Sequence, residues 1–396
     1  MNSKKTQASS NQNLVVKPTP SEYFIYRGAG SREMNWGQID GSNYFVTNDR
    51  FYVHNRSLPP QIDVASWELQ VTGPGIALSP QVITYEDILN LPPVFMIKAM
   101  VCGADGRGFY PKLPPVGSPS VGNDYVKWRP IAGSEWQYGA MGMAEWTGVL
   151  ISDVLELAGL KKDVAKSLLI QGLDSVEYSH AIPIDKALAD DSLLVYKMNG
   201  EPLPIDHGYP IRAFISGWGA NSNVKWVGGL EVSDKPVTLD NLPKWQKTQI
   251  LTGPDYPEPV IVTVQNVKST FELDWNSSLQ GGLNLLHGRA WSGTGTIEKV
   301  EVKIEKMDED HKWQPIWDPQ WRQSRFVPSE PVLPQSWVRW QIEWEAEEGY
   351  YRLMSKATNN TGETQPAPDE VPWNQSGLLY NGHVGLPVVV TPQPHC

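Results

Sequence analysis

One cysteine in the body of the chain stands where a reactive thiol could be placed. Cys102 follows the apolar run 96–101 and precedes a flexible stretch with glycines at 103, 106 and 108. The only other cysteine is the terminal Cys396, so Cys102 cannot belong to a four-cysteine zinc site or an iron–sulfur cluster. It is a buried inert thiol, a nucleophile, or one thiolate ligand to a metal held mostly by something else. Arg107 follows closely, and a nearby cation favours the thiolate.

A second group of residues could bind an anion. His207 and Arg212 lie in the segment 206–212, and Lys225 follows in the glycine-containing segment 223–232. Such side chains, together with exposed backbone amides, could grip a multiply charged anion through charge-assisted hydrogen bonds. The same residues could also form a solvated basic loop, and their pattern alone does not separate the two.

A third segment is rich in aromatic and small residues. Residues 133–148 contain two tryptophans and four glycines. Trp136 could wall a pocket, although packing in a core would use the same residue.

Local patterns predict the elements that must position these groups. Thr84, followed by two acidic residues, is typical of a capped helix start, and the apolar run before Cys102 predicts a buried strand, 94–101. A helix is predicted over 149–159, where apolar residues recur at spacings of three and four before a glycine. Further predictions are strands at 44–47, 51–54, 67–72 and 167–170, a short helix after Pro183, and a Pro/Gly-rich loop at 111–130.

Helical periodicity disappears after about residue 250. Short strands are predicted at 260–264, 299–304, 337–344 and 350–357, which suggests a β-sandwich of immunoglobulin type. The fold class is therefore α+β and β-rich. We expect a catalytic domain at 21–255 and an immunoglobulin-like domain at 256–396, with residues 1–20 as a disordered tail.

Composition excludes several classes of protein. The 396 residues carry a net charge of −11, which argues against nucleic acid as a partner. No Cys-x-x-Cys-His motif is present, so no c-type haem is expected, and no run of about 18 apolar residues predicts a membrane span. The polar start does not resemble a signal peptide. It suggests a soluble, cytoplasmic protein as the sequence stands, or a periplasmic one if a leader was removed.

Several motifs, taken in order, resemble the sulfite oxidase family of molybdenum enzymes, over about residues 40–385. The similar segments are the cysteine loop with Arg107, the blocks 135–140 and 144–149, Gly172–Asp174, 194–204, the His-Gly-Tyr-Pro-x-Arg motif at 207–212, Val-Lys-Trp at 224–226, 290–297 and 357–366. The resemblance implies a molybdopterin-binding domain followed by an immunoglobulin-like dimerisation domain.

The resemblance also implies roles for individual residues. Cys102 would supply the one protein sulfur to a molybdenum whose other sulfurs come from the dithiolene of molybdopterin. Arg107 matches an arginine of the family's anion pocket, and Trp136 matches a tryptophan that lines it. The positions that match contacts to the pterin or its phosphate are Asn55, Arg56, Asp174, His207, Arg212 and Lys225.

This chain departs from the family's pattern near the expected substrate site. His54 stands where the family has a first pocket arginine, and Arg56 stands where a pterin-binding histidine is common. Ser376 occupies another arginine position, and Ile250 replaces a characteristic tyrosine, leaving Tyr256 as the only nearby phenol. The cysteine loop has Ala-Asp at 104–105, where Gly-Asn is usual.

The substitutions lead to a hypothesis about the substrate. A sulfite or sulfate dianion needs strong cationic pairing to offset its desolvation, and one arginine plus a titratable histidine provides less. We therefore expect weak sulfite binding, or a less charged or organic substrate. If His54 faces the pocket, anion affinity is expected to fall as the pH rises through the imidazole pKa.

The activity that the resemblance implies is two-electron oxo-transfer, with sulfite or a related sulfur compound as the donor. Electrons would pass to an external acceptor such as a cytochrome c, or to oxygen. A homodimer is expected, with Trp313, Trp317 and Trp321 as candidate interface or core residues. The alternatives are a reductase of an S-oxide or another oxo-compound, a non-catalytic binding member of the family, and a cysteine hydrolase using His180 or His207 as its base.

Overall fold

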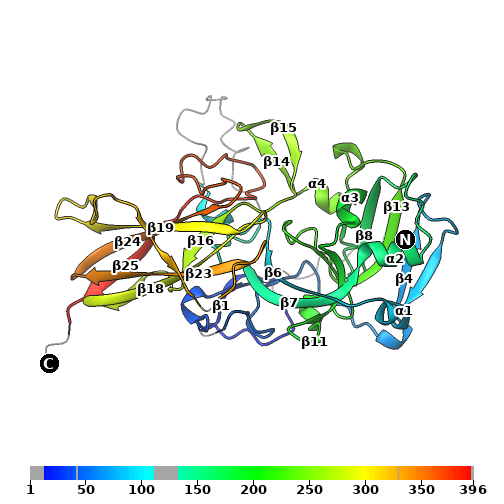
Figure 1. Cartoon of the computed structure of the whole chain (residues 1–396), viewed down its shortest axis with the longest axis horizontal. Coiled ribbons are helices and arrows are strands. Elements are labelled where there is room, and N and C mark those ends of the chain that lie inside the picture. Colours follow the sequence, from blue (N-terminus) through cyan, green and yellow to red (C-terminus); the bar gives the residue numbers. More distant parts are fainter. Residues whose placement is uncertain (1–12, 42, 111–132, 329, 394–396) are drawn as a thin grey trace, which may run out of the picture.

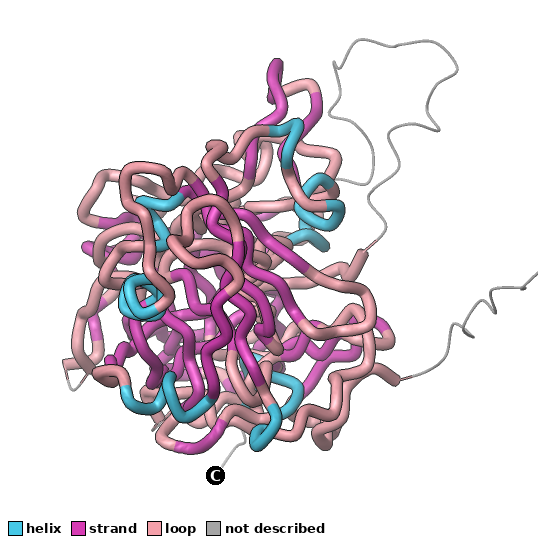
Figure 2. Tube along the Cα trace, turned by 90° about the vertical axis from the view of Figure 1, so that its right-hand side faces the viewer, coloured by secondary structure: helices cyan, strands magenta, loops and turns pink. Residues whose placement is uncertain are grey.

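The computed structural model describes residues 13–41, 43–110, 133–328 and 330–393. Most of the chain is built from β-strands, with a few short helices at the periphery (Figure 2). The first part of the chain forms one half of the molecule, and the last third forms a sandwich at the other end (Figure 1). The predicted loop 111–130 and the terminal Cys396 lie outside the described residues.

A five-stranded sheet carries the cysteine. Its longest pair, which lies at one edge of the sheet, runs antiparallel, and the register places Val94 opposite Gly148 and Val101 opposite Met141. The predicted strand before Cys102 is thus confirmed, and the strand pair delivers the thiol at one edge of this sheet. The strands are β6 (Val94–Val101), β7 (Met141–Leu150), β10 (Ser192–Met198), β11 (Glu201–Pro202) and β12 (Arg212–Ile215).

A second five-stranded sheet lies further from the sandwich and carries the helices. The predicted helix after Thr84 is confirmed, with a capping box between Thr84 and Asp87. The strands are β4 (Glu68–Thr72), β5 (Gln81–Thr84), β8 (Ser167–Gly172), β9 (Ser179–Pro183) and β13 (Val227–Ser233). The helices of this half are α1 (Tyr85–Asn90), α2 (Ile151–Leu157), α3 (Ile184–Ala187) and α4 (Lys244–Lys247).

Helix α2 is shorter than the predicted span 149–159. Val149 and Leu150 finish β7 instead, where they pair with Leu194 and Leu193 of β10. Their apolar side chains fit either period, so the strand pairing decides the conformation.

A small sheet and the N-terminal segment complete this half of the molecule. The sheet consists of β1 (Phe24–Gly28), β2 (Ser31–Met34) and β3 (Val53–His54). The predicted strand at 44–47 is wrong, because tertiary contacts hold this stretch: Tyr44 Oη reaches carbonyls of the sandwich half. Residues 13–20, which we expected in a disordered tail, instead lie against the domain, and Val15 is buried.

The sandwich confirms the immunoglobulin-like prediction. Its two sheets enclose one apolar core that includes Trp340, Leu353 and Val388. One sheet contains β16 (Lys268–Phe271), β18 (Gly282–Trp291), β23 (Trp337–Ala346) and β22 (Arg325–Phe326). The other contains β17 (Ser277–Gln280), β25 (Leu386–Thr391), β24 (Gly349–Asn359), β19 (Ile297–Met307), β20 (Trp313–Pro315) and β21 (Arg322–Gln323).

The halves meet through a continuous core rather than a simple linker. Residue 255 lies in the turn of a hairpin between β14 (Ile250–Gly253) and β15 (Tyr256–Ile261), which projects from the molecule (Figure 1). Trp36 stacks on Trp291 with ring centroids 5.9 Å apart, and the same cluster of buried residues includes the C-terminal Leu378. The C-terminal part therefore contributes to the core of the first half.

No helix within the described residues is long and apolar enough to cross a membrane.

Candidate active site

A cavity opens beside Cys102, where β6 ends. It contains about 1010 Å³ of space not filled by protein atoms, including its open mouth. Every predicted site residue lines it except Asn55, which is buried behind the wall. The lining comprises Phe51, Tyr52, His54, Arg56, Met100, Cys102, Gly103, Ala104, Arg107, Trp136, Asp174, Tyr178, Asp206, His207, Arg212, Ala220, Asn221, Asn223, Val224, Lys225, Trp226, Gln249 and Leu378.

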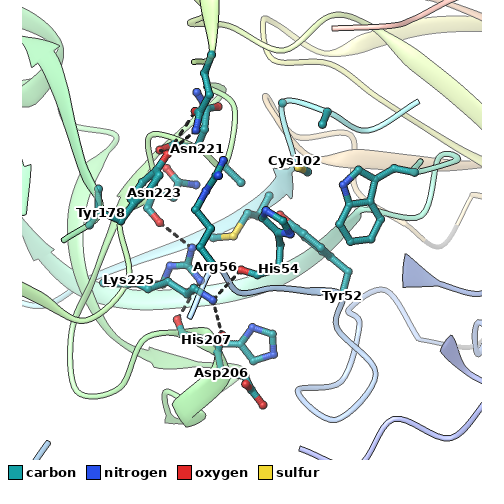
Figure 3. Close-up of a pocket in the computed structure, with 18 of the residues that line it drawn as sticks. Tyr52, His54, Arg56, Cys102, Tyr178, Asp206, His207, Asn221, Asn223 and Lys225 are labelled. Carbon is teal, nitrogen blue, oxygen red and sulfur yellow. Dashed lines mark hydrogen bonds between the residues drawn. The ribbon is translucent and has the colours of Figure 1, made fainter. Parts of the chain in front are cut away.

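The two ends of the cavity differ in chemistry. Figure 3 shows Cys102 on one side and Asp206, His207 and Lys225 on the other, with His54 and Arg56 between them. The predicted thiol and the predicted basic residues therefore line one cavity, although more than 100 residues separate Cys102 from His207 in the chain.

Cys102 is a free, partly buried thiol held by its backbone. Its amide donates to Ala140 O at 2.9 Å, across the strand pair. Burial raises the pKa of the thiol, while the amide of Ala104 and the charge of Arg107 oppose that shift. The expectation that Arg107 makes a thiolate here is therefore outweighed by desolvation, and a bound metal cation would supply the missing compensation.

Arg107 is fixed by the C-terminal segment. It opens a 3₁₀ turn (Arg107–Phe109), and Gly106 before it adopts a φ of +90°, where a Cβ would lie 2.7 Å from the Tyr138 ring. Its guanidinium donates to Ser376 O at 3.1 Å and to Gly377 O at 3.4 Å. Ser376, the position of a family arginine, does not line the cavity, and its hydroxyl donates to Ile250 O.

His54 packs against Trp136 and is uncharged near neutral pH. Its ring is 5.8 Å from that of Trp136 in an edge-to-face arrangement, and Nδ1 is 2.9 Å from Ser31 Oγ. Burial, with the nearby charges of Arg56, Lys225 and Arg107, lowers the pKa of His54 to about 3. The expected fall of anion affinity through a neutral-range histidine titration is therefore not supported by the structure.

Two cations, Arg212 and Lys225, gather at the opposite end beside His207. Arg212 donates to His207 O at 2.9 Å and to Asn223 O at 3.0 Å, while its buried Nε has no partner within the described structure. Lys225 donates to His54 O at 3.0 Å and to Asp206 O at 2.9 Å. Burial, then the charge of Arg212, lowers the pKa of Lys225 to about 7. An anion bound here would relieve this repulsion.

Asn55 and Asp206 brace the cations from behind. Asn55 Nδ2 donates to Asp206 Oδ1 at 2.8 Å, and Asn55 Oδ1 accepts from Lys225 Nζ. Asn55 thus acts on the cavity through Lys225 rather than by lining it.

The remaining wall combines aromatic rings with amides. The guanidinium of Arg56 lies 5.6 Å from the centre of the Tyr178 ring and 4.9 Å from that of Trp245, both within cation–π range. Asp174 accepts from the amide of Tyr178 at 2.8 Å, and Tyr178 Oη donates to Asn221 O at 2.7 Å.

Several lining residues escaped the sequence reasoning. Tyr52 and Tyr178 bring phenols to the cavity, whereas Tyr256, the only phenol we expected nearby, does not line it. Asp206 directly precedes the histidine of the motif at 207–212, and this position could have identified it as a site residue. No sequence pattern marks Asn221 or Gln249. His180, a candidate base for a cysteine hydrolase, does not line the cavity either.

The described residues alone do not supply a full set of ligands for a metal in this cavity. Within the described residues, no group of three or more His, Cys, Asp or Glu side chains could hold a metal ion. Cys102 can contribute one soft ligand, and the described residues leave the other positions of such a metal to a chelate.

Comparison with known proteins defines the class. Residues 55–239 match the oxidoreductase molybdopterin binding domain, and residues 258–389 match the Mo-co oxidoreductase dimerisation domain. The chain thus has the two-domain organisation of a molybdopterin-binding oxidoreductase.

Relatives narrow the class to a family. The mitochondrial sulfite oxidase of Rattus norvegicus is 26% identical over 371 residues, covering 88% of this chain and 62% of the relative. The sulfite oxidase of Arabidopsis thaliana is 25% identical over 374 residues, covering 85% and 86%. The chain belongs to the sulfite oxidase family of molybdopterin-dependent oxidoreductases. It spans less than two thirds of the length of the rat relative.

A solved structure has the same fold. The sulfane dehydrogenase SoxCD from Paracoccus pantotrophus superimposes with a TM-score of 0.73 at 23% identity, covering 95% of this chain and 87% of that one. At this identity the similarity concerns the fold.

The cavity fits the molybdenum–molybdopterin cofactor of the family. One thiol is available to the metal, and buried polar atoms without partners in the described structure, Arg212 Nε and Asn221 Oδ1, belong to residues of the wall. The crowded cations at the far end match the negative charge of a pterin phosphate.

Proposed function

We propose that this enzyme oxidises a small sulfur-containing donor by two-electron oxo-transfer and passes the electrons to an external acceptor. The observation that carries the proposal is the free Cys102 at one end of a cavity whose other end gathers His207, Arg212 and Lys225. A thiol that no further His, Cys, Asp or Glu cluster accompanies among the described residues, together with a distant anion-binding end, suits a metal–chelate cofactor better than a hydrolase.

The chain's residues divide into two groups. Cys102 would hold the metal, and the organic part of the cofactor would be held by Arg56, Asp174, His207, Arg212 and Lys225, with Asn55 positioning Lys225. When bound, this cofactor supplies an exchangeable oxo group and two-electron redox chemistry. The protein contributes orientation, charge complementarity and exclusion of water.

Arg107, His54, Trp136 and Tyr52 form the substrate side in this proposal. Of these, Arg107 is the permanent cation, and two carbonyl groups already engage its guanidinium. His54 is uncharged because its pKa is about 3, and Ser376 turns its hydroxyl away to Ile250. A dianion would be poorly compensated here, so we propose weak sulfite binding and a preference for a less charged sulfur compound.

The shortage of positive charge on the substrate side also favours a second candidate function, the reduction of an uncharged S-oxide. An aromatic, weakly cationic wall would bind such a molecule without a large desolvation cost. Steady-state assays in both directions, with an artificial electron acceptor and an artificial donor, separate the two. Low-micromolar sulfite Michaelis constants with fast turnover would contradict the weak-binding proposal.

We also propose a homodimer formed through the residues that match the dimerisation domain, and a soluble acceptor such as a cytochrome c. The candidate interface or core residues Trp313, Trp317 and Trp321 belong to this domain. The centre of each ring lies within 5 Å of the charged group of a cation in the same chain, which is Arg352, Arg322 and Lys356 in turn. Sedimentation at several protein concentrations tests the dimer.

The cofactor assignment has a direct test. We expect one molybdenum and one pterin per chain, measured by metal analysis and by fluorescence of the released oxidised pterin. Cys102→Ser should retain much of the pterin, since the anion grip is untouched, but lose turnover. A Cys102→Ser variant with wild-type turnover would refute the role of the thiol.

A further inference from the structure

Residues 13–17 run along the outside of the cavity wall and touch groups that face the cofactor site. Leu14 is fixed at both backbone atoms, because its amide donates to Ala29 O and its carbonyl accepts from Asn55 Nδ2, at 2.9 and 2.8 Å. Val15 is 4% exposed. We call residues 13–17 the N-terminal strap.

Asp206 anchors the strap. Its carboxylate accepts from the amide of Val16 at 3.0 Å and from that of Lys17 at 2.7 Å. The same carboxylate accepts from Asn55 Nδ2, and the Asp206 carbonyl accepts from Lys225. Two of the donors to this buried carboxylate are therefore backbone amides of the strap, and a third is the side-chain amide of Asn55, which also binds Lys225.

Lys17 inserts its ammonium group behind His207. Nζ lies 2.9 Å from Asn48 O, 2.5 Å from Phe51 O and 3.3 Å from His207 Nε2. An ammonium group has three N–H donors and no acceptor, and here it meets three acceptors. Burial lowers the pKa of Lys17 to about 7, against the charges of Asp206 and Asp49. In its charged form Lys17 can only donate, so His207 Nε2 is then the acceptor and the contact fixes the ring of a cavity-lining histidine.

We propose that the N-terminal strap retains molybdopterin in the cavity, and that Lys17 is the positioning residue for His207. The inference rests on the family's cofactor occupying the cavity and is independent of the substrate. Without the strap, Asp206 loses two donors and His207 loses the group that fixes its ring. Partners that orient metal-binding histidines typically change affinity by about 10- to 100-fold when removed, and we expect an effect of the same order for a histidine that holds the pterin.

The test compares four variants of the full holoenzyme. Lys17→Met removes the donor but keeps an apolar stem of similar length, and Lys17→Arg restores a donor. Lys162→Met is the matched control, because Lys162 lies on the surface with its side chain 66% exposed. Deletion of residues 2–12 is the second control, since it leaves the strap in place.

The measurements are the pterin content per chain after isolation and the rate of pterin loss during incubation in cofactor-free buffer. We expect Lys17→Met to lose pterin at least about tenfold faster than wild type, and Lys17→Arg to recover most of the difference. Both controls should match wild type. Thermal unfolding of cofactor-free protein separates retention from general stability, because the midpoint of Lys17→Met should stay near that of Lys17→Arg.

Retention of pterin by Lys17→Met at the wild-type rate would overturn the proposal. So would loss of pterin from the 2–12 deletion equal to that from Lys17→Met, because the effect would then not belong to the strap. Failure of the wild-type enzyme to oxidise any sulfur donor would contradict the proposed function, while leaving the retention measurement and the strap intact.

Discussion

A buried ion pair beneath the cysteine loop gives the sharpest stability prediction. Lys268 Nζ lies 3.0 Å from Asp105 Oδ2, and both side chains are completely buried. Lys268 also donates to Asp105 O at 2.8 Å, and Asp105 Oδ1 accepts from the amide of Ala140 at 3.0 Å. Asp105 is three residues after Cys102, whereas Lys268 is the first residue of β16. The pair therefore joins the metal-ligating loop to the sandwich.

The perturbation is Lys268→Met, which removes the charge and keeps most of the side-chain volume. Asp105 would then be a buried carboxylate with one backbone donor, and breaking a buried pair in this way costs about 3–5 kcal/mol. Burial already raises the pKa of Asp105 despite the neighbouring Lys268. Since the folded state then binds protons more readily than the unfolded state, the loss should be larger at pH 8 than at pH 5.

The assay is thermal unfolding of wild type, Lys268→Met, Asp105→Asn/Lys268→Met and the control Lys162→Met. Lys162 pairs with Glu156 at the surface, so its removal should cost no more than about 1 kcal/mol. We expect Lys268→Met to lower the midpoint by about 4–6 °C. The double variant should recover much of this, because it leaves no uncompensated charge. A double variant as unstable as Lys268→Met would refute the electrostatic reasoning.

Three further predictions concern histidines. His54→Arg places a permanent charge at the substrate side and should lower the sulfite Michaelis constant about tenfold; an unchanged constant would argue against a cation-poor pocket. Because the pKa of His54 is about 3, pH profiles of sulfite binding for wild type and His54→Gln should run parallel between pH 6 and 8, and diverging profiles would show that the imidazole titrates there. Burial also lowers the pKa of His180 to about 3. Its imidazole therefore stays unprotonated in the folded protein, whereas in the unfolded protein it binds a proton below about pH 6.5. The free energy of unfolding should therefore decrease as the pH falls from 6.5 towards 3. Urea unfolding should show that the decrease between pH 7 and pH 5 is about 2 kcal/mol larger in wild type than in His180→Gln.

The sequence predicted best the elements with strong local signals. The capping box at Thr84, the apolar run of β6 and the alternating strands of the sandwich are all present. Predictions failed where tertiary contacts replace local preference. Val149 and Leu150 join β7 because β10 offers them partners, and the stretch around Tyr44 is held by carbonyls of the sandwich half.

The site residues were predicted from sequence motifs, so residues outside these motifs were missed. Residues inside a recognisable pattern, such as Cys102 and His207, converge on one cavity. Lys17 and Tyr178 belong to no pattern, because their contacts with the site form only when distant segments fold together. The pKa of His54 was also out of reach, since desolvation depends on the packing of Trp136 and its neighbours.

The cysteine loop shows why the boundary between the domains does not divide the function. Arg107 is held by carbonyls of residues 376 and 377, and Tyr110 Oη donates to Leu378 O at 2.9 Å. Asp105 pairs with Lys268, so three residues of this loop take partners from the C-terminal part of the chain. A fragment ending near residue 255 would leave Asp105 unpaired and Arg107 without its acceptors. The part of the chain that matches a dimerisation domain therefore also fixes the geometry around Cys102, and the two parts should unfold cooperatively.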